Sequence, residues 1–143
     1  MNLAIKITLI FALYGSLYCN TKYVLPYDKS LLIESRNVLI AQIGVTEATG
    51  NNDGLQVERY LASVGLKKGN PYCQAGQYWC MLQVGKPPIP KSGLAISSFN
   101  YAKSQNNKVA FKPEQDDLLI WNKPKTIFGH IERIVEVGSK GWV

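Results

Sequence analysis

The sequence contains only one histidine, His130, and three cysteines, Cys19, Cys73 and Cys80. None of the cysteines forms a Cys-x-x-Cys pair, and one imidazole is too few for a typical zinc site, so we expect no metal and no cofactor. Charged residues make up only 18% of the chain and hydrophobic residues 46%, which excludes a disordered or fibrous protein. A length of 143 residues allows one domain, which we expect to act as a monomer.

A hydrophobic run long enough to span a bilayer is also lacking. The longest, from Ile7 to about Leu17, is shorter than the roughly 20 residues that a membrane helix needs, and it follows Lys6. This pattern predicts a secretory signal peptide over residues 1–19, and hence export to the periplasm, the cell envelope or the extracellular space. A buried N-terminal helix or a retained anchor is the alternative.

The residues around the end of this signal leave its type open. Lipid attachment at Cys19, as in a lipoprotein, is one possibility. It is the less favoured interpretation, because lipoprotein signals have a small residue directly before the cysteine and this chain has Tyr18 there. Residues 20–29 are polar and aromatic without periodicity, and we interpret them as a tether outside the fold.

The net charge of +6 favours a polyanionic partner, such as nucleic acid, anionic lipid or a cell-wall polymer. The lysines are scattered and form no dense run, which is typical of an ordinary solvated surface. A basic-aromatic stacking motif is absent as well, so nucleic-acid binding is not expected.

Apolar spacing divides the remaining chain into helices followed by strands. Helices are predicted over 30–43, with Ser30 as the N-cap, and over 57–64, 72–84 and 94–103; strands are predicted over 109–111, 117–121 and 129–137. This order predicts an α+β domain in which N-terminal helices pack on a small antiparallel sheet.

The two cysteines of the third predicted helix differ in their surroundings. They lie seven residues apart, about 10 Å along a helix axis, which is too far for a disulfide. Cys73 follows Pro71 at the first turn, where free N–H groups and the helix dipole stabilise a thiolate. Cys80 lies deeper, between apolar residues, and is typical of a buried thiol. Cys73 is therefore either a nucleophile or an inert core thiol.

A thiol nucleophile needs a base, and His130 is the one imidazole in the chain. His130 follows Gly129 in the alternating strand, so a structural histidine is the competing interpretation. If the chain is a cysteine-dependent enzyme, Cys73 and His130 must form its catalytic pair.

Four segments, in this order, resemble the CHAP family of cysteine- and histidine-dependent amidohydrolases/peptidases, within the NlpC/P60-like papain-type fold. The segments are residues 43–54 (IGVTEATGNNDG), 69–73 (GNPYC), 117–121 (DLLIW) and 129–131 (GHI). The resemblance covers residues 30–143. It implies a bacterial peptidoglycan amidase or endopeptidase that acts on stem peptides, with Cys73 as nucleophile and His130 as base.

The family commonly has small and aromatic residues after the cysteine, and this chain departs from that pattern with Gln74 and Gln77. Both glutamines could line a polar cleft, or Gln74 could be exposed on the first turn. Tyr72 and Gln74 are the candidate substrate-binding residues beside Cys73. Asp117 is expected to be structural, in the turn before its strand, and residues 51–53 are expected to form a turn.

The family's third catalytic residue, which orients the histidine from the next strand, has no counterpart here, so we expect the C-terminal strand or strands of the domain to be missing. Glu132 shares the His130 face of its strand but lies two residues along, about 7 Å away, which makes it a poor substitute. The alternatives to a hydrolase are a catalytically inactive CHAP-like module that binds the wall or a periplasmic partner, and a small immunity or inhibitor protein.

Overall fold

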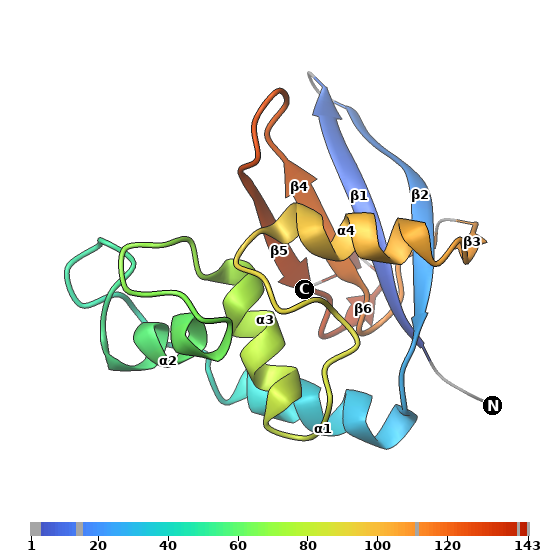
Figure 1. The fold of residues 1–143 in the computed structure, drawn as a ribbon. Helices are drawn as coiled ribbons and strands as arrows, with labels where there is room; N and C mark the ends of the chain where they lie inside the picture. Colours follow the sequence, from blue (N-terminus) through green and yellow to red (C-terminus); the bar gives the residue numbers. More distant parts are fainter. Residues whose placement is uncertain (1–3, 14–15, 111, 140, 143) are drawn as a thin grey trace.

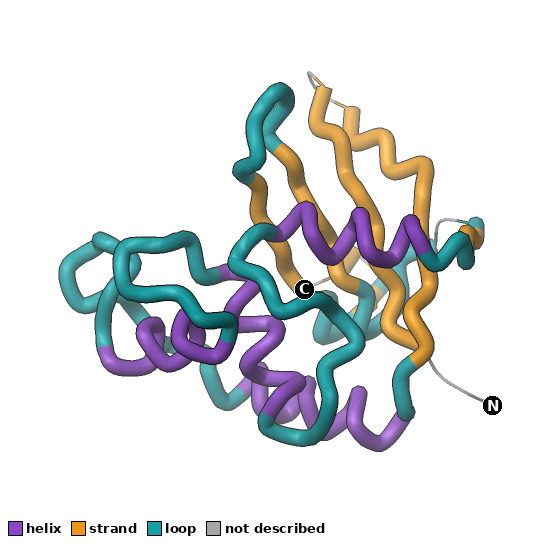
Figure 2. The backbone as a smooth tube through the Cα atoms, viewed as in Figure 1, coloured by secondary structure: helices purple, strands orange, loops and turns teal. Residues whose placement is uncertain are grey.

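The computed structural model describes residues 4–13, 16–110, 112–139 and 141–142. Four helices and a five-stranded sheet form its main part, with strand order β3-β2-β1-β4-β5. Neighbouring strands are antiparallel except for β1 and β4, which are parallel. The α+β class is therefore confirmed, with a mixed sheet in place of a purely antiparallel one. Helix α4 crosses one face of the sheet, and the other three helices lie together at one side of the sheet (Figures 1 and 2).

Two strands precede the helices, contrary to the predicted order of helices first and strands last. They are β1 (Ala4–Leu13) and β2 (Ser16–Pro26), and β1 lies between β2 and β4 in the sheet. Removal of residues 1–19 as a signal peptide stays a prediction. In the full-length chain these residues supply β1 and the beginning of β2.

The tether predicted for residues 20–29 is wrong, because most of this segment belongs to the fold. Tyr23, Leu25 and Tyr27 alternate along the chain, and all three are buried in the main core cluster. On the opposite face of β2, Lys22 is only 1% exposed, and its Nζ lies 2.7 Å from Asp117 Oδ2. The alternation cannot be recognised as an apolar–polar pattern in the sequence, because the residues between the buried ones, Val24 and Pro26, are also non-polar.

The first helix, α1 (Lys29–Ile40), begins one residue before the predicted N-cap. Asp28 caps it, since its Oδ1 accepts hydrogen bonds from the backbone N–H groups of Ser30 at 2.8 Å and Leu31 at 3.3 Å. Ser30 is thus a first-turn residue. The carboxylate of Asp28 satisfies N–H groups that a helix start otherwise leaves free.

The next two helices agree with their predicted positions. Helix α2 (Leu55–Ser63) buries Val57, Tyr60 and Leu61 against Ala75 of α3 (Cys73–Leu82). Helix α3 also packs against α1 and β5, so its first turn lies where helices and sheet meet. This packing holds Cys73 next to the edge of the sheet.

The last helix, α4 (Ala95–Ser104), is connected to α3 by buried hydrogen bonds. Gln74 is fully buried, and its Oε1 accepts a hydrogen bond from Ser98 Oγ at 3.0 Å. The strand β3 (Lys108–Val109) follows α4 and pairs with β2. The apolar face of α4, with Phe99 and Ala102, covers the core residues Leu118 and Ile120 of the sheet.

Strands β4 (Leu118–Asn122) and β5 (Gly129–Arg133) form the hairpin that carries His130. Gly129 lies against the backbone of β4, since a Cβ atom there would come within 2.3 Å of the Trp121 carbonyl oxygen. A side chain at this position would push β5 away from β4. The glycine before the histidine is therefore explained by close backbone approach.

A buried ion pair anchors β5 to α1. Arg133 is 6% exposed and contacts Asp116 Oδ1 through Nε at 3.0 Å and Nη2 at 2.7 Å. Its guanidinium also donates to the Leu32 carbonyl oxygen at 2.8 Å and to Ser35 Oγ at 3.1 Å, both in α1. Since Arg133 lies three residues after His130, this network fixes the strand that presents the imidazole.

Asp117 and residues 51–53 have the structural roles expected of them. Asp117 is 1% exposed, and its Oδ2 accepts a hydrogen bond from the backbone N–H of Glu114 at 2.8 Å, in the turn before β4. In the other loop, Asp53 Oδ1 accepts from the Thr49 N–H at 2.9 Å, and Asn52 adopts a positive φ of 53°. Both segments are turns stabilised by side chain to backbone bonds.

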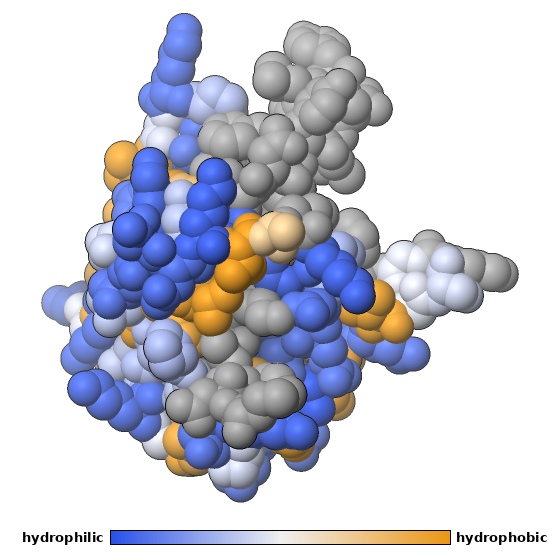
Figure 3. Space-filling view, turned by 90° about the vertical axis from the view of Figure 1, so that its right-hand side faces the viewer, coloured by the Kyte–Doolittle hydropathy of each residue, from blue (hydrophilic) through white to orange (hydrophobic). Residues whose placement is uncertain are grey.

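The C-terminal part of the described chain forms a small hairpin of β6 (Val137–Gly138) and β7 (Gly141–Trp142), separate from the main sheet. No helix among the described residues has both the length and the apolar character required to cross a membrane. The face of the molecule shown in Figure 3 is mostly hydrophilic, with small hydrophobic areas between the polar side chains.

Candidate functional site

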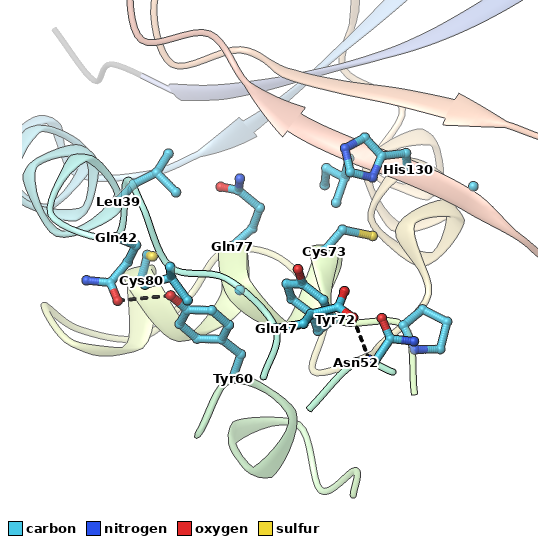
Figure 4. Close-up of a pocket in the computed structure, with 15 residues that line it drawn as sticks. Leu39, Gln42, Glu47, Asn52, Tyr60, Tyr72, Cys73, Gln77, Cys80 and His130 are labelled. Carbon is cyan, nitrogen blue, oxygen red and sulfur yellow. Dashed lines mark hydrogen bonds between the residues drawn. The ribbon is translucent and has the colours of Figure 1, made fainter. Parts of the chain in front are cut away.

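The structure brings together the two residues predicted to form a catalytic pair. Cys73 is the first residue of α3, and His130 is the second residue of β5, the edge strand of the sheet. Figure 4 shows the thiol of Cys73 below the imidazole ring of His130. The two side chains are near enough for hydrogen bonding between them to shift the pKa of each. They come from elements 57 residues apart in the sequence that meet where α3 packs against β5.

The electrostatics of the pair favour a charged thiolate. Burial alone would raise the pKa of Cys73, but the hydrogen bond and the positive charge of His130, with backbone N–H groups of Ile131 and Gln74, lower it below the ordinary value. The hydrogen bond from Cys73 in turn raises the pKa of His130, with a further contribution from Glu132, against the opposing effect of burial. Both shifts favour a thiolate–imidazolium pair.

The N–H of Ile131 reaches the sulfur because β5 is an edge strand. One side of β5 pairs with β4, which leaves backbone groups on the other side without strand partners. Helix α3 occupies that side and places Cys73 opposite the free N–H. The thiolate is thus stabilised by the start of a helix and by the edge of a sheet together.

Glu132 lies much closer to His130 than strand spacing indicated. Its Oε1 is 3.2 Å from His130 Nε2, although the residues are two positions apart on one strand. The expectation that Glu132 is a poor partner is therefore wrong. Spacing of about 7 Å applies to the Cα atoms, and the glutamate side chain is long enough to span it.

A cleft of about 490 Å³ opens beside the thiol. Its walls come from the end of α1 and the loop after it, from α2, from the first two turns of α3 and from β5. They include Leu39, Gln42, Glu47, Tyr60, Tyr72 and Gln77 in addition to Cys73 and His130 (Figure 4). Cys73 and His130 lie at the surface of this cleft, since Cys73 is half-buried and the His130 side chain is 56% exposed.

The two residues predicted to bind substrate have different positions. Tyr72 lines the cleft next to Cys73, as predicted. Gln74 does not line it, because its side chain is fully buried between α3 and α4, where it bonds Ser98. In its place Gln77, one helical turn after Cys73, lines the cleft. A residue directly after the nucleophile projects to another side of the helix, whereas a residue four positions on shares its face.

Glu47 is a cleft residue that sequence reasoning did not identify. Its Oε2 accepts a hydrogen bond from the backbone N–H of Asn52 at 2.8 Å, which fixes the loop to the cleft wall. Burial, followed by the charge of Glu47, raises the pKa of Tyr72, so the phenol beside Cys73 stays protonated. No local pattern marks Glu47, because the path of its loop depends on contacts with α2 and α3.

Cys80 is the inert thiol that its surroundings indicated. It is 1% exposed, and burial raises its pKa to about 11. Among the described residues, Cys73 and Cys80 are both free of disulfides. Cys73 alone of the two combines access with a lowered pKa.

Within the described ranges, no group of three or more histidine, cysteine or acidic side chains could hold a metal ion. Comparisons with protein-family models, with curated proteins and with solved structures find no match for this chain.

Proposed function

We propose that the protein is an exported cysteine-dependent hydrolase of bacterial peptidoglycan, an amidase or endopeptidase of the CHAP kind with a papain-like fold. One observation carries the proposal: a half-buried thiol at the start of a helix and the one histidine of the chain line the same cleft and shift each other's pKa. The four sequence segments that resemble the CHAP family support the substrate class.

In the proposed reaction, His130 takes the proton of Cys73 and the thiolate attacks an amide carbonyl carbon of a stem peptide. Backbone N–H groups at the start of α3, which a helix leaves without internal partners, stabilise the oxyanion. The imidazolium then gives its proton to the leaving amine as the C–N bond breaks, forming a thioester. Water, deprotonated by His130, hydrolyses the thioester and restores the thiol.

The proposal predicts new termini in purified peptidoglycan after incubation with the protein, detected by mass spectrometry. Cys73→Ser should abolish them, because a serine hydroxyl has no lowered pKa beside this histidine. Cys80→Ala is the matched control, because Cys80 also lines the cleft but is only 1% exposed and lies about two helical turns from Cys73, and the new termini should still form. The position of the new termini identifies the bond that is cut.

The main alternative is a catalytically inactive module that binds the wall. Such a module would co-sediment with peptidoglycan, produce no new termini, and bind equally well with Cys73→Ser. That set of results would overturn the hydrolase proposal.

A further inference from the structure

The imidazole of His130 is held from the side opposite the thiol. Glu132 Oε1 lies 3.2 Å from His130 Nε2, so the other ring nitrogen, Nδ1, is the one left for Cys73. We propose that Glu132 is the positioning residue of this site: it binds Nε2–H and thereby orients Nδ1 toward the thiol. This inference rests on the proposed function for its catalytic consequence, but the interaction itself can be measured without substrate.

The strand geometry makes Glu132 suitable for this role. His130 and Glu132 point to the same face of β5, where they stand opposite Trp121 and Leu119 of β4. The Trp121 ring lies beside the imidazole, with ring centroids 6.3 Å apart and planes at 37°. The imidazole is thus in contact with Cys73, Glu132 and Trp121, which restricts its rotation.

Few charged groups near His130 affect its protonation. The charged groups that act on it are Cys73 from α3 and Glu132 from β5 itself, while β4 contributes the uncharged ring of Trp121. Glu136, three residues after the end of β5, is exposed and does not contribute. One carboxylate therefore influences both the tautomer of His130 and the pH range in which it stays protonated.

The chemical consequence concerns the position of one proton. In the neutral imidazole, a hydrogen bond from Nε2–H to Glu132 places the proton on Nε2 and leaves the lone pair of Nδ1 for the thiol proton. After proton transfer, the imidazolium donates from Nε2 to the carboxylate and from Nδ1 to the thiolate. A carboxylate stabilises this charged form more than a neutral acceptor does.

The test compares Glu132→Ala, Glu132→Gln and the control Glu136→Gln by NMR of the imidazole nitrogens, which is unambiguous because the chain has one histidine. For NMR, the variants are made in a Cys73→Ser background, where no thiolate competes for the ring proton, and in that background with Glu132 intact we expect the Nε2–H tautomer at high pH. Glu132→Gln should keep this tautomer, since the amide oxygen still accepts, but lower the apparent pKa of His130 by about 0.3 to 0.7 units, as for a half-exposed ion pair.

Glu132→Ala should lower the pKa by a similar amount and also mix the tautomers. With peptidoglycan as substrate and Cys73 intact, Glu132→Ala should reduce kcat at least about tenfold with little change in KM. This reduction is smaller than the one seen when the buried carboxylate of a catalytic triad is removed. Glu132→Gln should recover much of that kcat, and Glu136→Gln should match the wild type in every measurement.

The inference is overturned if Glu132→Ala retains the wild-type tautomer and titration, or if Glu136→Gln changes them equally. Failure of the proposed function gives a different result: the NMR changes occur as expected, but neither the wild type nor any variant cleaves peptidoglycan.

Discussion

The lowered pKa of the Cys73 thiol depends on His130, and replacing that histidine tests the site without any assumption about substrate. In His130→Ala, the hydrogen bond and the positive charge that lower the pKa are both lost, while burial, the largest influence on the thiol, still raises it. The pKa of Cys73 should then rise, because of the groups that lower it only the backbone N–H groups of Ile131 and Gln74 remain. The thiolate fraction at pH 7 should fall accordingly.

The assay is the pH dependence of alkylation by iodoacetamide, followed at the Cys73 peptide by mass spectrometry. A shift of the pKa lowers the thiolate fraction tenfold per unit, but the more basic thiolate is more nucleophilic and recovers about threefold, so the rate at pH 7 falls only about three- to fourfold per unit. The midpoint of the profile is therefore the better measure, and it should move to higher pH in the variant.

Cys80 provides an internal control in the same digest, because its pKa of about 11 and its burial should keep it unmodified in both proteins. If the profiles of wild type and His130→Ala coincide, the two side chains do not interact, and the site lacks an activated nucleophile. Unfolding of the variant would be recognised by alkylation of Cys80.

Two further predictions concern the elements that hold β5. Asp116→Ala leaves the guanidinium of Arg133 buried without its carboxylate, and the free energy of unfolding from urea denaturation should fall by about 3–5 kcal/mol; a change below 1 kcal/mol would contradict the buried network. Gly129→Ala places a Cβ atom 2.3 Å from the Trp121 carbonyl oxygen and should cost about 1–3 kcal/mol in the same assay, whereas Gly138→Ala, with its nearest atom at 3.8 Å, should be nearly neutral. Equal effects of the two glycine variants would refute the close approach.

The helices could be predicted from sequence because each buries an apolar stripe whose spacing is visible locally. Val57, Tyr60 and Leu61 of α2 illustrate this, since all three are buried as their spacing indicates. The pairing of Cys73 with His130 could be predicted for a different reason, because chemistry left only one candidate base. Neither inference required knowledge of the tertiary arrangement.

Some residues of the site could not be identified from the sequence, because their positions depend on the tertiary arrangement. Glu47 lies in the cleft because of the path that its loop takes. Turn residues such as Asn52 show in the sequence that a loop is present, but they do not determine its path in space. Backbone spacing alone predicts no contact between Glu132 and His130, whereas the length of the glutamate side chain allows one. Adjacency to Cys73 in the sequence does not place Gln74 in the cleft, because successive helical residues project in different directions.

For the N-terminal residues, the prediction from the sequence pattern and the observed structure disagree most. Residues 1–19 have the pattern of a signal peptide, yet residues 4–13 form β1, which pairs antiparallel with β2 and parallel with β4. A chain without residues 1–19 would lose the strand that joins these two, and backbone groups on the facing edges of β2 and β4 would lose their partners.

We therefore expect a chain that begins at residue 20 to unfold at a markedly lower urea concentration than the full-length chain, with tryptophan fluorescence as the probe. The mass of the protein recovered from an expressing bacterium shows whether residues 1–19 are removed. If the short form is recovered and is as stable as the long one, β1 is dispensable, and helices α1 to α4 with β4 and β5 suffice to hold the thiol against the imidazole.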